Sequence, residues 1–228
     1  MASNATYRGP VDLPETIPVF PLPGALLLPR GQLPLNIFEP RYLAMIDDAL
    51  KGARIVGMIQ PDEAKPGSLA SASPMQPALY EVGCAGRITS FEETGDGRYL
   101  VTLSGICRFR LIEELPLTTP YRQCRVDFTA FASDFMANLG DDEVDRDALL
   151  GTLSAYLDAN RIEADWSGIR EAPVEALVNG LSMMSPYGAR EKQALLEAPD
   201  LKTRADLLIA VTEFALAEKG EDGETSLQ

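Results

Sequence analysis

The stretch Ile17–Leu43, IPVFPLPGALLLPRGQLPLNIFEPRYL, decides the fold. It combines six prolines with many aliphatic and aromatic residues. Because proline has no N–H group and fixes φ, this stretch is not expected to form one long helix or a central strand. Its apolar side chains still need burial. We therefore predict short extended segments over residues 15–38, lying at sheet edges and leading into a helix.

That helix is predicted over residues 40–51. Pro40 suits the first turn of a helix, where no N–H donor is needed. Tyr42, Ile46 and Leu50 then recur at helical spacing.

In the rest of the chain the spacing of apolar residues changes once, from the pattern of strands to the pattern of helices. A buried strand is predicted over residues 54–60, followed by a proline- and serine-rich loop over 61–77 that is either functional or a tolerated insertion. Turn residues at 94–97 predict a hairpin of two long strands. The predicted strands are 79–93, 98–114 and 121–131, and the predicted helices are 141–157, 172–184, 189–197 and 201–219.

Strands followed by helices indicate an α+β chain with segregated layers. We predict a flexible N-terminus over residues 1–14, a β-rich lobe over 15–132, a helical bundle over 133–219 and a polar tail over 220–228. The net charge of −14 is concentrated in the second half. Residues 1–132 carry 14 acidic and 12 basic side chains, whereas residues 133–228 carry 20 and 8. An acidic surface repels nucleic acids and anionic membranes, so neither is expected as a partner.

Several classes of chemistry lack their usual residues. The chain has no histidine, no C-x-x-C pair and no phosphate-binding loop of the form G-x-x-x-x-G-K-[ST]. None of the five lysines lies in a recognisable nucleophile motif. We therefore expect no metal, no cofactor and no enzymatic activity. The three cysteines, with no secretory signal or membrane span in the sequence, are expected to be free thiols of a cytoplasmic protein.

Several segments together resemble one known family. They are Pro18–Leu22 (PVFPL), Leu33–Tyr42 (LPLNIFEPRY), Gly83–Ile88 (GCAGRI), Leu103–Phe109 (LSGICRF) and Glu191–Glu197 (EKQALLE). Their order and spacing are similar to the N-terminal, substrate-binding domain of Lon protease. Cys84 replaces the threonine that is common in that family.

The resemblance implies a PUA-like lobe, a pseudo-barrel of about six strands with one helix, followed by a bundle of about four helices. In Lon this domain precedes an ATPase and a Ser-Lys peptidase and helps to capture substrates, so the resemblance implies a stand-alone binding module without those activities. Residues of the family motifs are expected to form a scaffold: Pro21, Phe38, Glu39, Arg41, Tyr42, Gly105, Arg108 and Phe109.

The leading functional hypothesis is a non-catalytic module that binds unfolded or extended polypeptide and works with a protease or chaperone partner. Irregular apolar segments can form a groove for peptide. The residues proposed for this groove, which could instead be core, are Phe20, Leu22, Leu26, Leu27 and Leu28. The alternative is a small-molecule-binding or sensing domain with a pocket between the two lobes.

Glu39 and Arg41 flank Pro40 inside the apolar stretch. We expect them to cap backbone N–H groups of the helix or to pair with each other or with a partner. If they are structural, Glu39→Ala or Arg41→Ala should destabilise the protein by about 1–3 kcal/mol.

Overall fold

The computed structural model describes residues 5–64 and 77–225. The chain divides into two compact units. The first, here called the β unit, comprises residues 1–136 and 187–196. The second, the helical unit, comprises residues 137–186 and 197–228. Most of the predicted loop over residues 61–77 lies outside the described residues.

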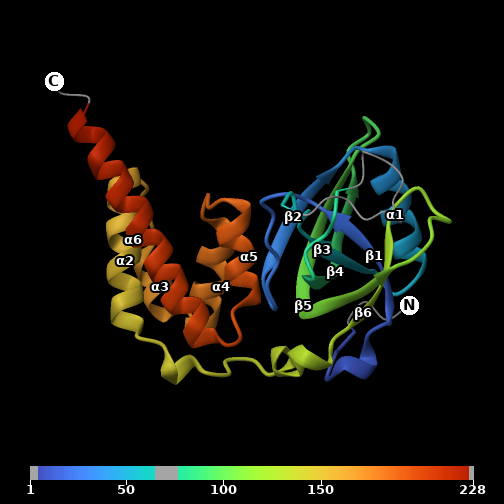
Figure 1. Cartoon of the computed structure of the whole chain (residues 1–228), viewed down its shortest axis with the longest axis horizontal. Helices are drawn as coiled ribbons and strands as arrows, with labels where there is room; N and C mark the ends of the chain where they lie inside the picture. The colour runs from blue at the N-terminus through green and yellow to red at the C-terminus, as the bar shows by residue number, and fades with distance from the viewer. Residues whose placement is uncertain (1–4, 65–76, 226–228) are drawn as a thin grey trace. The chain divides into compact units, whose positions relative to one another are not determined.

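The β unit is built on a six-stranded mixed sheet that closes into a near-barrel (Figure 1). Among the described strands only β1 and β3 pair in parallel, and the strand order is β2-β5-β4-β3-β1-β6 with β5 also paired to β6. This architecture, with one helix beside the barrel and a helical region after it, confirms the predicted α+β class. The strands are β1 (Thr16–Pro21), β2 (Gln32–Ile37), β3 (Ile55–Ile59), β4 (Val82–Glu93), β5 (Tyr99–Glu114) and β6 (Gln123–Asp127).

The ring closes because β5 has two different neighbours along one side. Its first part, residues 99–104, pairs with β2, and its second part, residues 110–114, pairs with β6. Gly105 lies where β5 leaves β2, and the β4–β5 register shifts at this point. A Cβ atom at Gly105 would overlap the backbone carbonyl of Leu28, which crosses here. Glycine at this position therefore permits the bend that closes the barrel.

Strand β1 corrects one prediction. It lies between β3 and β6, so the expectation that no part of the proline-rich stretch forms a central strand is wrong. Residues 16–18 pair with β6 and residues 19–21 pair with β3. Pro18 and Pro21 each lie at the end of one ladder, where a missing N–H removes few hydrogen bonds.

The hairpin between β4 and β5 has the predicted turn. Gly95 and Gly97 have φ values of 75° and 85°, which glycine adopts at no steric cost. Thr94 N–H donates to the carbonyl of Arg98 at 3.1 Å. Strand 121–131, by contrast, ends early, because a short 3-10 segment, Thr129–Phe135, follows β6.

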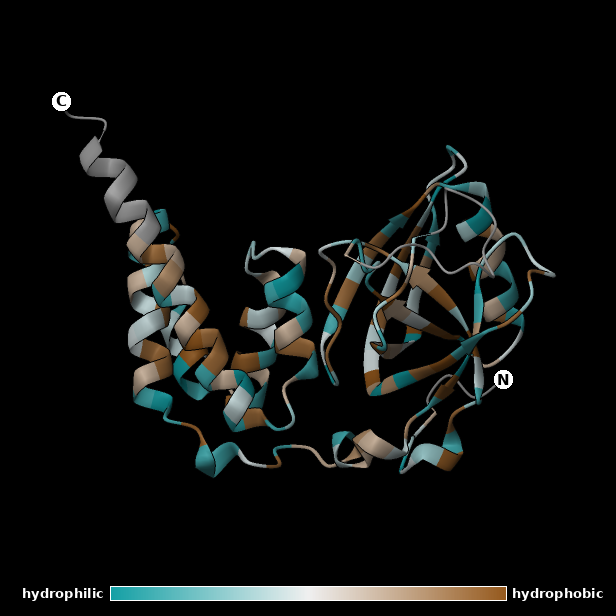
Figure 2. Ribbon diagram, viewed as in Figure 1, coloured by the Kyte–Doolittle hydropathy of each residue, from teal (hydrophilic) through white to brown (hydrophobic). Residues whose placement is uncertain are grey.

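The barrel interior forms the core of the β unit. Hydrophobic and hydrophilic residues are mixed along β2 and β5 (Figure 2), and burial alternates along β2 and the first part of β5, whereas every residue of β3 is buried. Phe109 is fully buried and its ring lies 6.3 Å from that of Phe128. The three cysteines are free and buried in this unit, as predicted: Cys84, Cys107 and Cys124.

Two helices belong to the β unit. Helix α1 (Pro40–Lys51) has the predicted bounds. Helix α5 (Ala189–Glu197) also has the predicted bounds, and its residues 189–196 group with the barrel although they follow the other helices in sequence. Gln193 donates to the carbonyl of Val82 at 3.1 Å, and Gln60 donates to the carbonyl of Ala189 at 2.9 Å. Buried amide side chains thus fix α5 to the ends of β3 and β4.

The helical unit contains α2 (Arg146–Asn160), α3 (Trp166–Glu171), α4 (Val174–Met184) and α6 (Leu201–Thr225). Helix α2 begins later than predicted because Asp145 caps it, accepting a hydrogen bond from Ala148 N–H. Helix α3 is too short to show a periodic pattern and was not predicted. Short 3-10 helices also lie at Pro10–Asp12 and Asp141–Glu143. No described helix has both the length and the apolar composition needed to cross a bilayer.

Candidate functional site

A pocket of about 250 Å³ lies in the β unit. Its walls come from the end of β1, the first turn of α1, the segments that follow β3 and precede β4, and the loop before β6. These segments are far apart in sequence, so only the closed barrel brings them together. The lining residues are Pro21, Pro23, Arg41, Tyr42, Pro61, Glu63, Pro77, Pro120, Tyr121 and Arg122.

The walls of the pocket are formed mainly by proline and tyrosine rings. Proline is favoured where strands end, because it cannot continue a ladder of hydrogen bonds. The Tyr42 ring packs against Phe20 with centroids 4.2 Å apart, and the Arg41 guanidinium lies 4.5 Å from the Tyr42 centroid. Phe20 is part of the core, so Tyr42 is held firmly in place.

Glu39 and Arg41 form an ion pair with an N–O distance of 2.8 Å, so the expectation that they pair with each other is confirmed. The alternative of capping does not apply: Glu39 is the N-cap residue of α1, but its side chain makes no capping hydrogen bond. Both side chains are more than 40% exposed, because the helix begins at the surface. The pair therefore contributes at most about 1 kcal/mol, less than expected for buried charges.

Arg122 is held more tightly than Arg41. Its Nε and Nη2 atoms donate to Glu114 at 2.7 and 2.5 Å, and its Nη1 donates to the carbonyl of Pro77 at 3.0 Å. The Arg122 side chain is 9% exposed. This arginine fixes one wall of the pocket while its charge remains close to Tyr42.

The two tyrosine hydroxyls differ. Tyr121 donates to Asp48 at 2.9 Å. The Tyr42 hydroxyl makes no hydrogen bond within residues 5–64 and 77–225. Burial raises the pKa of Tyr42, and the charges of Arg41 and Arg122 act in the opposite direction. Tyr42 is thus a protonated donor at neutral pH, on the wall of a pocket.

The predicted peptide-binding residues lie mainly in the core. Phe20 is 7% exposed, Leu26 2%, Leu27 1% and Leu28 0%, whereas Leu22 is half-buried. Phe20 packs against Tyr42 of α1, Leu27 lies beside Gly86 of β4, and the backbone of Leu28 crosses β5 at Gly105. Peptide binding by the five residues stays a prediction.

The motif residues lie in three different places. Pro21, Arg41 and Tyr42 line the pocket, which sequence reasoning did not predict. Phe38 is 61% exposed, next to the pair formed by Glu39 and Arg41. The other motif residues are structural: Gly105, Arg108 and Phe109. The one sequence signal for the pocket was the excess of prolines at strand ends.

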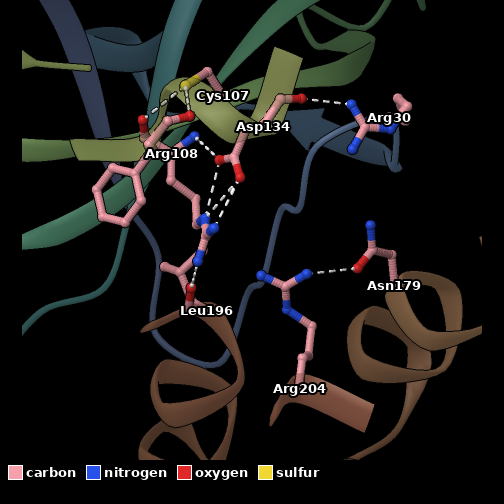
Figure 3. Close-up of polar contacts among 8 residues, drawn as sticks. Arg30, Cys107, Arg108, Asp134, Asn179, Leu196 and Arg204 are labelled. Atoms are coloured by element: carbon pink, nitrogen blue, oxygen red, sulfur yellow. Dashed lines mark hydrogen bonds and ion pairs between the residues drawn. The ribbon is translucent and has the colours of Figure 1, made fainter. Parts of the chain in front are cut away.

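Arg108 lies at the centre of a buried polar cluster (Figure 3). Its Nε and Nη2 atoms donate to the Asp134 carboxylate at 2.9 and 2.8 Å, and its own backbone N–H donates to the same carboxylate at 2.9 Å. Its Nη1 donates to the carbonyl of Leu196 at 3.1 Å. Arg108 therefore connects β5, the segment after β6 and the last turn of α5. This pattern fits a structural role.

The free edge of the sheet is blocked. Strand β2 pairs only with β5, so its other edge has no strand beside it among the described residues. Pro34 lies opposite Thr102 in the middle of β2. Because proline has no N–H, it fits only a ladder position whose backbone points away from β5. The free edge thus lacks a donor at its centre, which disfavours addition of a peptide strand there.

No group of three or more potential metal ligands occurs among the described Cys, Asp and Glu residues. Besides the Glu63 carboxylate, the polar groups that line the pocket are the guanidinium groups of Arg41 and Arg122 and the hydroxyls of Tyr42 and Tyr121, which can donate hydrogen bonds to anions.

Solved structures share this fold. A Lon N-terminal domain protein from Xanthomonas campestris matches with a TM-score of 0.58 and 22% identity over 86% of this chain and 97% of that one. The N-terminal domain of the Mycobacterium avium complex Lon protease matches with a TM-score of 0.57 and 17% identity, covering 87% of this chain and 98% of that one.

Curated relatives are longer proteins. Lon protease 2 of Myxococcus xanthus is 25% identical over 205 residues, covering 87% of this chain and 23% of that protein. Lon protease 2 of Sorangium cellulosum is 28% identical over 215 residues, covering 86% of this chain and 24% of that protein. The chain thus spans about a quarter of the length of these relatives. The sequence model of the family described as the ATP-dependent protease La (LON) substrate-binding domain matches residues 16–212, and the chain belongs to that family.

Proposed function

We propose that the protein is a non-catalytic module that binds polypeptide through the pocket lined by Pro21, Tyr42, Pro120 and Tyr121. The observation that carries the proposal is this pocket, whose walls are proline and tyrosine rings, in a member of a substrate-binding family. Proline and tyrosine rings give a large apolar contact area and lose little side-chain entropy on binding. A segment captured here would be presented to a protease or chaperone partner.

The size of the pocket favours one side chain of a longer chain. Pockets for drug-sized molecules usually occupy about 300–1,000 Å³, and a cavity of about 150 Å³ accommodates a benzene ring. A volume of about 250 Å³ therefore fits a single large apolar side chain. The rest of the polypeptide would lie across the exposed rim, which includes Pro23, Glu63 and Pro77.

Binding to an unfolded protein tests the proposal. Pro120→Trp would place a large side chain in the mouth of the pocket, because Pro120 is exposed and lines it. Pro116→Trp is the matched control, since Pro116 is exposed in the same loop but does not line the pocket. We expect anisotropy titration with a labelled, permanently unfolded protein to show binding by the wild type and the control, and at least tenfold weaker binding by Pro120→Trp.

Equal binding by both variants would place the polypeptide elsewhere. Absence of binding by the wild type, together with thermal stabilisation by a metabolite from a screening panel, would favour the small-molecule hypothesis instead. In either outcome the proposed function would be wrong as stated.

A further inference from the structure

The polar groups of the pocket are mainly donors. Arg41, Tyr42 and Arg122 all lie on its walls, and both arginines are close enough to affect the pKa of the Tyr42 hydroxyl. The one acidic lining residue, Glu63, is exposed on the rim. A ligand that fits such a site combines an apolar group with a negatively charged acceptor.

Arg41 is available to such an acceptor. Its Nε and Nη2 atoms both contact the same oxygen of Glu39, at 2.9 and 2.8 Å. The Nη1 atom has no partner among the described residues. Because the pair with Glu39 is exposed and weak, an incoming carboxylate can share or replace it at little cost.

Tyr42 is the second, independent feature. Tyr42 is 6% exposed as a residue, and its hydroxyl makes no hydrogen bond within the described ranges. This hydroxyl is open to the pocket rather than enclosed in the protein, since Ser182 Oγ is the one fully buried side-chain oxygen or nitrogen without a partner among the described residues. A ligand acceptor in the pocket would satisfy this donor.

The first turn of α1 adds to the same preference. Arg41 and Tyr42 are the second and third residues of this twelve-residue helix, and no side chain caps its N-terminus. Pro40 has no N–H, and the N–H groups of Tyr42 and Leu43 donate to the carbonyl of Glu39 at 2.9 and 3.0 Å, so the helix dipole is the feature that favours negative charge at this end. The Arg41 guanidinium, the Tyr42 hydroxyl and the dipole of α1 therefore all favour an anionic acceptor at one side of the pocket.

We propose that the pocket recognises a polypeptide residue whose apolar side chain lies beside a carboxylate, with Arg41 and the Tyr42 hydroxyl as the specificity-determining donors. This inference rests on the proposed polypeptide-binding function. The carboxylate comes either from the C-terminal residue of the bound polypeptide or from an acidic side chain next to the apolar residue. Both sources present the same acceptor to the same donors.

Three labelled peptides distinguish the sources. All three end in a single phenylalanine. The first two share one sequence, and the first has a free C-terminal carboxylate whereas the second has a C-terminal amide. The third also has a C-terminal amide and differs from the second only by a glutamate before the phenylalanine. We expect one or both carboxylate-bearing peptides to bind about tenfold tighter than the neutral amide, since charge-assisted hydrogen bonds have about that effect. The peptide that binds more tightly identifies the source of the carboxylate.

Variants assign the preference to its donors. Arg41→Gln and Tyr42→Phe should each reduce the ratio of carboxylate-peptide affinity to amide-peptide affinity to about threefold or less. Tyr42→Phe keeps the ring packed against Phe20. Arg125→Gln is the control, because Arg125 forms an ion pair of similar exposure with Glu113 but does not line the pocket, and it should keep the full preference.

Two results would overturn the inference in distinguishable ways. If all three peptides bind equally well and Pro120→Trp weakens them equally, the pocket binds polypeptide without reading a carboxylate, and only the further inference fails. If Pro120→Trp leaves every affinity unchanged, the pocket is not the site and the proposed function fails as well. A carboxylate preference that survives in Arg41→Gln and Tyr42→Phe would also refute the assignment.

Discussion

Replacement of Asp134 by asparagine should destabilise the β unit strongly. The Asp134 carboxylate accepts hydrogen bonds from two guanidinium nitrogens of Arg108 and from its backbone N–H, all at 2.8–2.9 Å. The two side chains are 7% and 3% exposed. In Asp134→Asn the guanidinium faces a neutral amide and loses the carboxylate opposite it. Removing one partner of a buried ion pair typically costs about 3–5 kcal/mol.

That loss is large compared with the stability of a domain. Native domains are stable by about 5–15 kcal/mol, and urea m-values are about 1–3 kcal/mol per molar. A loss of about 4 kcal/mol with an m-value near 2 lowers the urea midpoint by roughly 2 M. It also raises the equilibrium fraction of unfolded β unit roughly a thousandfold, because each 1.4 kcal/mol is a factor of ten.

The chain carries separate probes for its two units. All three cysteines are buried in the β unit, so their reaction with a thiol reagent reports its opening. Burial raises the pKa of Cys124 to about 12, so the folded protein presents little thiolate. The single tryptophan, Trp166, lies in α3 and reports the helical unit. We expect Asp134→Asn to accelerate native-state thiol labelling about a hundredfold or more.

Two controls sharpen the test. Glu113→Gln breaks an exposed ion pair with Arg125 and should leave thiol labelling unchanged. The double variant Arg108→Met/Asp134→Leu removes both charges and should be more stable than Asp134→Asn, since no buried charge then lacks a partner. If Asp134→Asn labels like the wild type, or if the double variant is the less stable one, the cluster does not hold the unit together as we argue.

Three smaller changes test other parts of the structure. Arg41→Ala breaks only the exposed ion pair with Glu39, so the thermal midpoint of unfolding should stay near that of the wild type. A loss of stability above about 2 kcal/mol would show that Arg41 is part of the scaffold. Gly105→Ala should lower the free energy of unfolding by about 1–3 kcal/mol or more, because the added Cβ overlaps the crossing backbone. Gly180→Ala, which has open space around it in α4, should raise the free energy of unfolding by up to about 1 kcal/mol. Similar urea midpoints for the two variants would contradict the close approach at Gly105. Arg146→Ala removes the donor to three backbone carbonyls at the end of α3 and should lower the stability of the helical unit by about 1–3 kcal/mol. An unfolding transition, followed by tryptophan fluorescence, that does not shift would show that this cap is unimportant.

Local patterns determined the secondary structure well where one signal dominated. The bounds of α1 followed from Pro40 and the spacing of apolar residues, and the turn before β5 followed from two glycines with positive φ. These signals act between residues a few positions apart, so no tertiary contact is needed to interpret them. Helix α3 was missed because six residues hold less than two full turns of pattern.

The tertiary structure decided which residues are inside and which are available to a ligand. Leu26, Leu27 and Leu28 are buried because the chain crosses the barrel at Gly105, and this crossing depends on a contact between segments about 75 residues apart. Glu39 and Arg41 are exposed because α1 begins at the surface of the barrel.

The pocket depended even more on the fold. Its prolines, tyrosines and arginines come from segments that lie between residues 21 and 122, and each is ordinary by itself. The sequence alone determined that the chain contains a proline-rich, apolar start of an α+β domain, because composition and periodicity are local properties. Only closure of the barrel determined that Tyr42 and Arg41 share a wall with Pro120, because that closure depends on pairing between distant strands.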